Sequence, residues 1–376
     1  MIYITSVRLF LFVFLIASIK IYSQYHVKKI IPLSEKDTTG GYLYEIKWSK
    51  DKNFFVYTSK RFQKKDTIKV LLLEQNTQKS RIYYLPLPDT IMNDVGIEDI
   101  SFNSDKMILA ILNFYYVIFY DLNSGKMIDL VNNNNSHKIY FIGNNEFLLE
   151  KLYNFHPLDD SIQCEFRVYS LSQKKFIKTY SFHYEDIKYT ILIHQFIDVY
   201  SNKILLSYST KFKMFIFDNN LNKIDSINIS YLPMKKNLLP SNTYQPAKEV
   251  YSYLKKLDTI NTRIEKVFFN NDSSIIVSIR PPKSDFNYRT LLFLEKIHNQ
   301  WYINRTIEWK RNKKITKKER WLDFTGSDKL LIKNNLIIGL YPYTPLFLKS
   351  KNKKKYYEKF SKKNEIPVAF YIFQID

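Results

Sequence analysis

Cysteine is almost absent from this chain of 376 residues. The single cysteine, Cys164, excludes an intrachain disulfide and also any Cys-x-x-Cys metal or redox pair. We interpret Cys164 as a small buried hydrophobic residue before a strand, with a reactive thiol as the alternative. The fold must therefore depend on its hydrophobic core, and apolar residues make up 45% of the sequence.

Glycine is also scarce, with seven in the whole chain and one adjacent pair, Gly40-Gly41. Phosphate-binding loops need several glycines close together, so a site of that kind is excluded. The sequence also lacks a Gly-x-Ser-x-Gly elbow, a His-Glu-x-x-His zinc motif and an Asp-rich calcium loop with its central glycine. We expect no cofactor and no metal. His183, Glu185 and His194 are interpreted as solvated turn residues, with a metal site as the alternative.

Long apolar runs are missing after the N-terminus. Residues 9–19 form an apolar run that is too short to cross a bilayer and is typical of a secretory signal. A basic residue, Arg8, precedes the run and a small polar segment follows it, so we predict a signal peptide over residues 1–23. An uncleaved signal anchor is the alternative. The predicted chain is exported to the periplasm or outside, and we expect no transmembrane segment after the signal.

Acidic residues are fewer than basic ones. The chain has 36 Asp and Glu and 57 Lys and Arg, which gives a net charge of +21. This excess of positive charge indicates either an anionic partner or a solvated basic surface that follows only from the overall amino-acid composition. We prefer the interpretation as a solvated surface. Residues 301–311 interleave aromatic and basic side chains as in nucleic-acid binders, but strand alternation explains the same pattern. A nucleic-acid partner is therefore not expected.

A strand–turn–strand pattern recurs along most of the chain. In residues 100–130, four short β-prone runs are joined by polar turns at residues 103–106 and 123–126. Weaker copies occupy residues 46–57, 139–149, 196–207, 267–277 and 321–332. The apolar residues just before the turns are about 40 to 70 residues apart, which is the size of a four-stranded propeller blade.

Two stretches resemble β-propeller repeat proteins of the WD-repeat and TolB-like kind: Phe102-Asn-Ser-Asp-Lys-Met-Ile-Leu-Ala110 and Phe119-Tyr-Asp-Leu-Asn-Ser-Gly-Lys126. The Trp-Asp dipeptide of that family is absent, and Tyr120-Asp121 and Phe217-Asp218 are its nearest echoes. Ile21-Tyr-Ser-Gln24 resembles the end of the export signal in proteins of the Bacteroidetes type. The resemblance implies an all-β, six-bladed β-propeller over residues 24–376.

The ends of the repeat series predict how such a ring would close. Residues 26–33 form an extended apolar segment that belongs to no copy, and the sixth copy ends at residues 368–374 without a fourth strand. We predict that the N-terminal segment pairs with this C-terminal strand, which removes two open sheet edges.

Two insertions interrupt the repeats, at residues 232–262 and 349–365. The first contains Pro246 followed by a short amphipathic helix over residues 247–257, which we expect to cover one mouth or a blade flank, with partner binding as the alternative. The second is rich in lysine and is interpreted as a solvated loop, with polyanion contact as the alternative.

Ligands of propellers most often approach the axis, at the end where the innermost strands begin. The residues that enter these strands carry mixed charge and suit a peptide or a glycan: Glu98, Asp99, His137, Lys138, His194, Gln195, Arg263, Glu265 and Arg320. We therefore predict an exported, non-enzymatic propeller that binds a protein or glycan through its axial face and loops.

Two other functions remain open at this point. The first is a propeller-type glycosidase or lyase that uses the axial carboxylates of Glu98, Asp99 and Glu265. The second is a polyanion binder, whose affinity would fall in high salt.

Overall fold

The computed structural model describes most of the predicted repeat region. The described residues are 26–32, 44–49, 54–59, 67–74, 80–88, 97–133, 135–152, 162–184, 195–208, 211–228, 263–280, 288–310, 330–333, 336–342 and 368–374. The regular elements in these ranges are β-strands, labelled β1 to β24. In this part of the chain, no helix has the length and apolar character needed to cross a membrane.

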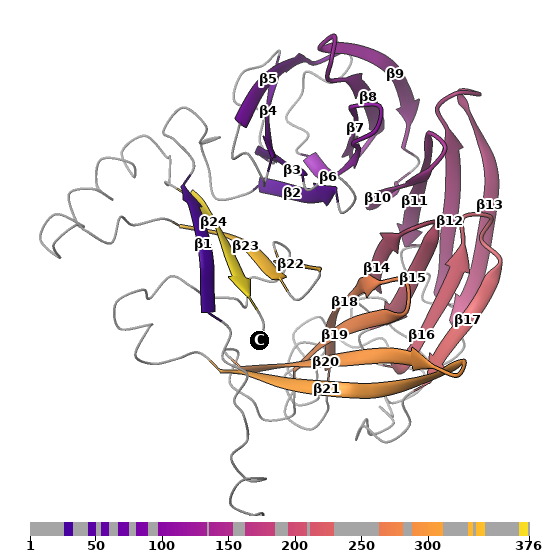
Figure 1. Ribbon diagram of the computed structural model, residues 1–376. Coiled ribbons are helices and arrows are strands. Elements are labelled where there is room, and N and C mark those ends of the chain that lie inside the picture. The colour runs from indigo at the N-terminus through magenta and orange to yellow at the C-terminus, as the bar shows by residue number, and fades with distance from the viewer. Residues whose placement is uncertain are drawn as a thin grey trace, which may run out of the picture.

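Five four-stranded antiparallel sheets are built from consecutive strands, each paired with the next along the chain (Figure 1). They are β2 (Tyr44–Ser49), β3 (Phe54–Ser59), β4 (Thr67–Glu74) and β5 (Ser80–Pro86); β6 (Ile97–Asn103), β7 (Ile108–Asn113), β8 (Tyr116–Asp121) and β9 (Lys126–Asn132); β10 (Lys138–Gly143), β11 (Glu146–Leu152), β12 (Ile162–Ser170) and β13 (Lys175–Tyr184); β14 (Gln195–Tyr200), β15 (Lys203–Tyr208), β16 (Lys211–Asp218) and β17 (Lys223–Asn228); and β18 (Arg263–Asn271), β19 (Ser274–Arg280), β20 (Tyr288–Ile297) and β21 (Gln300–Lys310).

A further four-stranded sheet joins the two ends of the described chain. Its order is β1-β24-β23-β22, with β22 (Leu330–Lys333), β23 (Leu336–Pro342), β24 (Val368–Gln374) and β1 (His26–Pro32). In the antiparallel β1–β24 ladder, Ile30 lies opposite Tyr371 and His26 lies opposite Gln374. The structure thus places the two segments expected to close the ring side by side.

The sheets follow one another in chain order, and the first strand of each lies beside the first strand of the next. These neighbours are β2 and β6, β6 and β10, β10 and β14, β14 and β18, and β18 and β22. The predicted all-β class is confirmed, and the four-stranded antiparallel sheets resemble propeller blades.

The hydrophobic core lies between neighbouring sheets. Residues on β7 are buried along its whole length, because both of its faces are covered. Between the sheets β6–β9 and β10–β13, the ring of Phe119 lies 5.0 Å from that of Phe147 and 5.4 Å from that of Tyr169, measured between centroids. Full burial of such a side chain contributes about 1.5–3 kcal/mol, so these apolar layers hold the sheets together.

Asparagine occupies several turn positions that glycine commonly fills. The backbone φ angle is positive at Asn144 (48°) and Asn145 (62°), between β10 and β11. It is also positive at Asn202 (62°), between β14 and β15. Asparagine tolerates this left-handed conformation better than most residues with a Cβ atom.

Several predicted features lie outside the described residues. These are the signal peptide (residues 1–23), both insertions (232–262 and 349–365), the helix expected over 247–257, and the side chains of Cys164, His183, Glu185, His194, Gln195, Arg263 and Arg320.

Candidate ligand-binding site

The structure places three of the nine predicted axial residues at the start of an innermost strand. Lys138 begins β10, Gln195 begins β14 and Arg263 begins β18. His137 directly precedes β10, and its backbone N–H donates to the carbonyl oxygen of Glu150 at 2.8 Å. These residues therefore share the end of the sheets at which the sequence places ligand binding.

The three predicted axial carboxylates have different environments. Glu98 on β6 is exposed, and Glu265 on β18 is half-buried. Asp99 is completely buried, and its Oδ2 accepts a hydrogen bond from the backbone N–H of Ile139 at 3.0 Å. Asp99 therefore joins β6 to β10, the innermost strand of the next sheet, which is a structural role that the sequence did not indicate.

Two further side chains form similar bonds between innermost strands. Ser101 Oγ on β6 accepts a hydrogen bond from the N–H of Phe141 on β10 at 2.6 Å. Asp198 Oδ2 on β14 accepts one from the N–H of Phe269 on β18 at 2.7 Å. Each bond satisfies a backbone donor where two sheets meet, so these polar side chains stabilise the junction between sheets.

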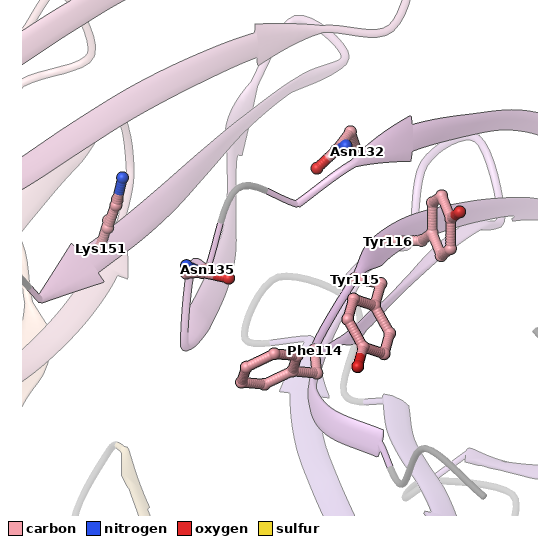
Figure 2. A pocket seen from close by; sticks show the side chains of 6 residues that line it. All are labelled: Phe114, Tyr115, Tyr116, Asn132, Asn135 and Lys151. Carbon is pink, nitrogen blue, oxygen red and sulfur yellow. The ribbon is translucent and has the colours of Figure 1, made fainter. Parts of the chain in front are cut away.

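A cleft opens at the end of the sheets where β6 and β10 begin. The antiparallel registers establish this position, because Asn113 lies opposite Ile97 and Glu150 lies opposite Lys138. The cleft has a volume of about 280 Å³. It is lined by residues of the β7–β8 turn, the β9–β10 connection and β11: Phe114, Tyr115, Tyr116, Asn132, Asn135 and Lys151 (Figure 2). None of the nine predicted axial residues is among them.

Three consecutive aromatic residues dominate one side of the cleft. Phe114 is 44% exposed and Tyr115 is 55% exposed, and their ring centroids lie 5.0 Å apart in an edge-to-face arrangement. The Tyr116 ring follows at 6.5 Å from that of Tyr115. Figure 2 shows Asn135 facing Phe114, with Lys151 on the neighbouring sheet beyond it. The cleft thus combines aromatic surface with amide and ammonium groups.

The aromatic turn is held by the side chain of Asn113, at the end of β7. Its Oδ1 accepts hydrogen bonds from the backbone N–H groups of Tyr115 at 2.8 Å and Tyr116 at 2.6 Å. Asn113 is itself completely buried. An Asx-type turn of this kind fixes the backbone locally and leaves the following side chains free to point into solvent.

A second buried asparagine, Asn133, connects the turn to the β9–β10 connection. Its Nδ2 donates to the carbonyl oxygens of Asn113 at 2.6 Å, Ser136 at 2.8 Å and Phe114 at 3.3 Å. Its backbone N–H donates to the carbonyl oxygen of Tyr115 at 2.7 Å. Both walls of the cleft are therefore fixed to one polar centre.

Sequence reasoning missed this cleft because it considered only the residues that enter the innermost strands, whereas other connections at the same end of the sheets line the cleft. The available signal was Asn113, since asparagine favours turns. In the sequence, the two residues between β15 and β16 are Ser209 and Thr210, at the corresponding place of another sheet. Among the residues that the structure describes, no cluster of His, Cys, Asp or Glu could hold a metal ion.

Comparison with known proteins finds similarity at the level of the fold. A member of the DUF4221 family from Bacteroides vulgatus superposes with a TM-score of 0.57 over 94% of this chain and 98% of that chain, at 11% identity. The β-propeller domain of Cps50 (Swd1) from Myceliophteria thermophila gives 0.40 over 94% and 100%, at 12% identity. The β-propeller domain of the Trilobed protease from Pyrococcus furiosus gives 0.40 over 79% and 76%, at 9% identity. No family model and no curated protein matches the sequence.

Proposed function

We propose that this chain is an exported, non-enzymatic β-propeller of six blades, closed by β1 against β24, that binds a protein or glycan at the end where the innermost strands begin. The order of the sheets and the β1–β24 ladder support the ring. The apolar run at residues 9–19 supports export.

One observation carries the binding function: two exposed aromatic side chains stand on a rigid turn beside a cleft at this end of the sheets. Phe114 and Tyr115 are exposed to water. Each ring therefore lacks the stabilisation that burial would give it. Exposed aromatic residues next to a concave surface are typical of binding sites.

Catalysis by axial carboxylates is less well supported. A glycosidase needs two carboxylates about 5–10 Å apart that both reach the substrate. The buried Asp99 is occupied with the Ile139 N–H, which leaves Glu98 and Glu265 on sheets that are not neighbours in the chain order. We therefore propose binding without turnover.

Arrays of glycans and peptides, probed with the purified chain over residues 24–376, test this function. The variant Phe114→Ser/Tyr115→Thr serves as comparison, because it copies Ser209 and Thr210 at the corresponding connection. We expect the original chain to bind a ligand and release it unchanged, and the variant to lose binding while it unfolds at the same temperature.

Two results would contradict the proposal. Cleavage of the bound ligand that disappears in Glu98→Gln or Glu265→Gln would show an enzyme. Equal binding by the original chain and the aromatic variant would place the site elsewhere.

A further inference from the structure

We infer that the cleft beside the β7–β8 turn is a carbohydrate subsite, in which the aromatic rings pack on a sugar ring and the amides bind its hydroxyl groups. This inference rests on the proposed binding function and names its ligand class. The cleft consists of Phe114, Tyr115, Tyr116, Asn132, Asn135 and Lys151.

The aromatic rings provide the first half of the recognition. A sugar ring presents a flat face of C–H groups, which packs against the electron-rich face of an aromatic ring. The half-exposed rings of Phe114 and Tyr115 are inclined at 84° to each other and so offer two different surfaces. The Tyr116 ring extends this surface and is inclined at 57° to that of Tyr115.

The polar groups of the cleft provide the second half. An asparagine side chain carries two donor hydrogens and one acceptor oxygen, which suits a hydroxyl group that both donates and accepts. Asn132 and Asn135 are exposed at the cleft, and Asn135 has a φ angle of 64°. Lys151 lines the cleft from the neighbouring sheet.

The same composition argues against a polyanion. A site for nucleic acid or another polyanion contacts its ligand with several cations, whereas one lysine and two neutral amides line this cleft.

A protein partner would be recognised through a deeply buried anchor side chain. A cleft of 280 Å³ lies just under the range of about 300–1,000 Å³ for pockets that enclose whole ligands, so it suits one or two units of a longer glycan.

The hydrogen-bonded framework of the turn favours binding by such a small site in energetic terms. The buried amides of Asn113 and Asn133 fix the backbone of the aromatic turn before a ligand arrives. Binding then costs less conformational entropy than it would on a mobile loop.

Affinity gel electrophoresis and calorimetry with laminarin, glucomannan, xylan, polygalacturonate and hyaluronan test this inference on the chain over residues 24–376. We expect at least one of these polysaccharides to bind. Phe114→Ser/Tyr115→Thr should weaken that binding by about tenfold or more, because it removes both exposed stacking surfaces at once. Asn135→Gly keeps the positive φ angle but removes the amide, so we expect a smaller loss of about threefold to tenfold.

Tyr84→Ser is the matched control, because Tyr84 is 65% exposed on β5 and does not line the cleft. This variant should bind like the original chain, and thermal unfolding should confirm that all variants fold. If none of the polysaccharides binds, or if the aromatic variant retains full affinity, the carbohydrate subsite is overturned. If a peptide binds instead and the aromatic variant loses it, the subsite is again overturned, but the proposed binding function stands.

Discussion

At the scale of single residues, the aspartates of the two Trp-Asp echoes have a local structural role. Asp121 follows Tyr120 at the end of β8, where its Oδ1 accepts the N–H of Asn123 at 2.9 Å and its Oδ2 accepts the hydroxyl of Ser124 at 2.8 Å. These hydrogen bonds, chiefly that from Ser124, hold the pKa of Asp121 below its usual value. Asp218 accepts the N–H of Asn222 at 2.8 Å in the same way. In both sheets, the aspartate therefore stabilises the turn that leads to the outer strand, whether tyrosine or phenylalanine precedes it.

Asp225 on the outer strand β17 gives the fold a predictable acid sensitivity. Partial burial alone would raise the pKa of this carboxyl, but hydrogen bonds from Lys296 Nζ at 2.7 Å and Trp301 Nε1 at 3.0 Å hold it below its usual 3.8. Because the pKa is lower in the folded state, the resulting stabilisation is complete above 3.8 and is lost as the pH falls through the folded pKa.

We predict that Asp225→Asn lowers the free energy of unfolding by about 1 kcal/mol at neutral pH. The difference from the original chain should shrink as the pH falls below about 4, because protonation then removes the same charge from Asp225. Urea unfolding at a series of pH values measures both quantities. A difference that stays constant down to pH values near 2 would contradict the assigned role.

At the scale of elements, local hydrogen bonding explains which turns the sequence predicts. Asn103 Oδ1 accepts the N–H groups of Asp105 at 3.0 Å and Lys106 at 3.3 Å, and polar residues surround it, so the β6–β7 turn is visible in the sequence. Asn113 forms the same arrangement at the next turn, where the residues that follow it are aromatic. The four runs of residues 100–130 imply a break at this place, but composition does not show that the exposed residues of the turn are Phe114 and Tyr115.

The role of Asp99 could not be predicted from local patterns. Its partner Ile139 lies on the following sheet, so the bond between them depends on how two sheets pack. The repeat spacing placed Asp99 just before a strand that begins at Ile100, whereas Asp99 lies within β6. It could not indicate that this side chain faces a neighbouring backbone, whereas Glu98 beside it faces solvent. Strand alternation gives opposite directions to adjacent side chains but does not say which is which.

The polar centre at Asn133 should control both the stability and the rigidity of the cleft. Asn133→Ala removes the amide that donates to the carbonyl oxygens of Asn113 and Ser136 and leaves these buried acceptors unpaired. We expect a loss of about 2–3 kcal/mol in the free energy of unfolding. Hydrogen exchange at the amides of Tyr115 and Tyr116 should become faster, because the turn loses its side-chain hydrogen bonds to the β9–β10 connection and keeps only the backbone bond from residue 133.

Asn132→Ala is the control for this prediction, since Asn132 is the exposed neighbour of Asn133. A surface change of this kind should alter stability by no more than about 0.5 kcal/mol. Equal effects of the two substitutions, or unchanged exchange at Tyr115 in Asn133→Ala, would show that the network does not hold the turn.

At the scale of the whole molecule, hydrogen bonds join neighbouring sheets at two places. One set links the innermost strands of adjacent sheets, and the other links strands farther out. The inner ties are those of Asp99 and Asp198. The outer ties include the hydroxyl of Tyr120, which donates to the carbonyl oxygen of Pro86 at 2.6 Å, and that of Tyr169, which donates to Asp129 Oδ2 at 2.5 Å. Each outer tie runs from β8 or β12, the third strand of its sheet, to the outer strand of the sheet before it. With the apolar layers between them, these bonds couple adjacent sheets.

The closure of the ring depends on the β1–β24 ladder, which an engineered disulfide can test. Ile30 lies opposite Tyr371, and Cα atoms of directly opposed residues in antiparallel strands are about 4.5–5.5 Å apart, within disulfide range. In a Cys164→Ser background, we expect Ile30→Cys/Tyr371→Cys to oxidise to an intramolecular disulfide. The bond would close a loop of several hundred residues and should raise the free energy of unfolding by roughly 2–4 kcal/mol, reversibly on reduction.

A pair that is displaced along the same ladder serves as the control for register. Gln374 lies opposite His26, so Ile30→Cys/Gln374→Cys places the two thiols about three residues apart along the strand, or roughly 10 Å. This pair should stay reduced under conditions that oxidise the first pair. Non-reducing electrophoresis and thiol titration distinguish the two variants. If both pairs cross-link equally, or if neither does, β1 does not lie on β24 in the stated register, and the proposed closed propeller is incorrect.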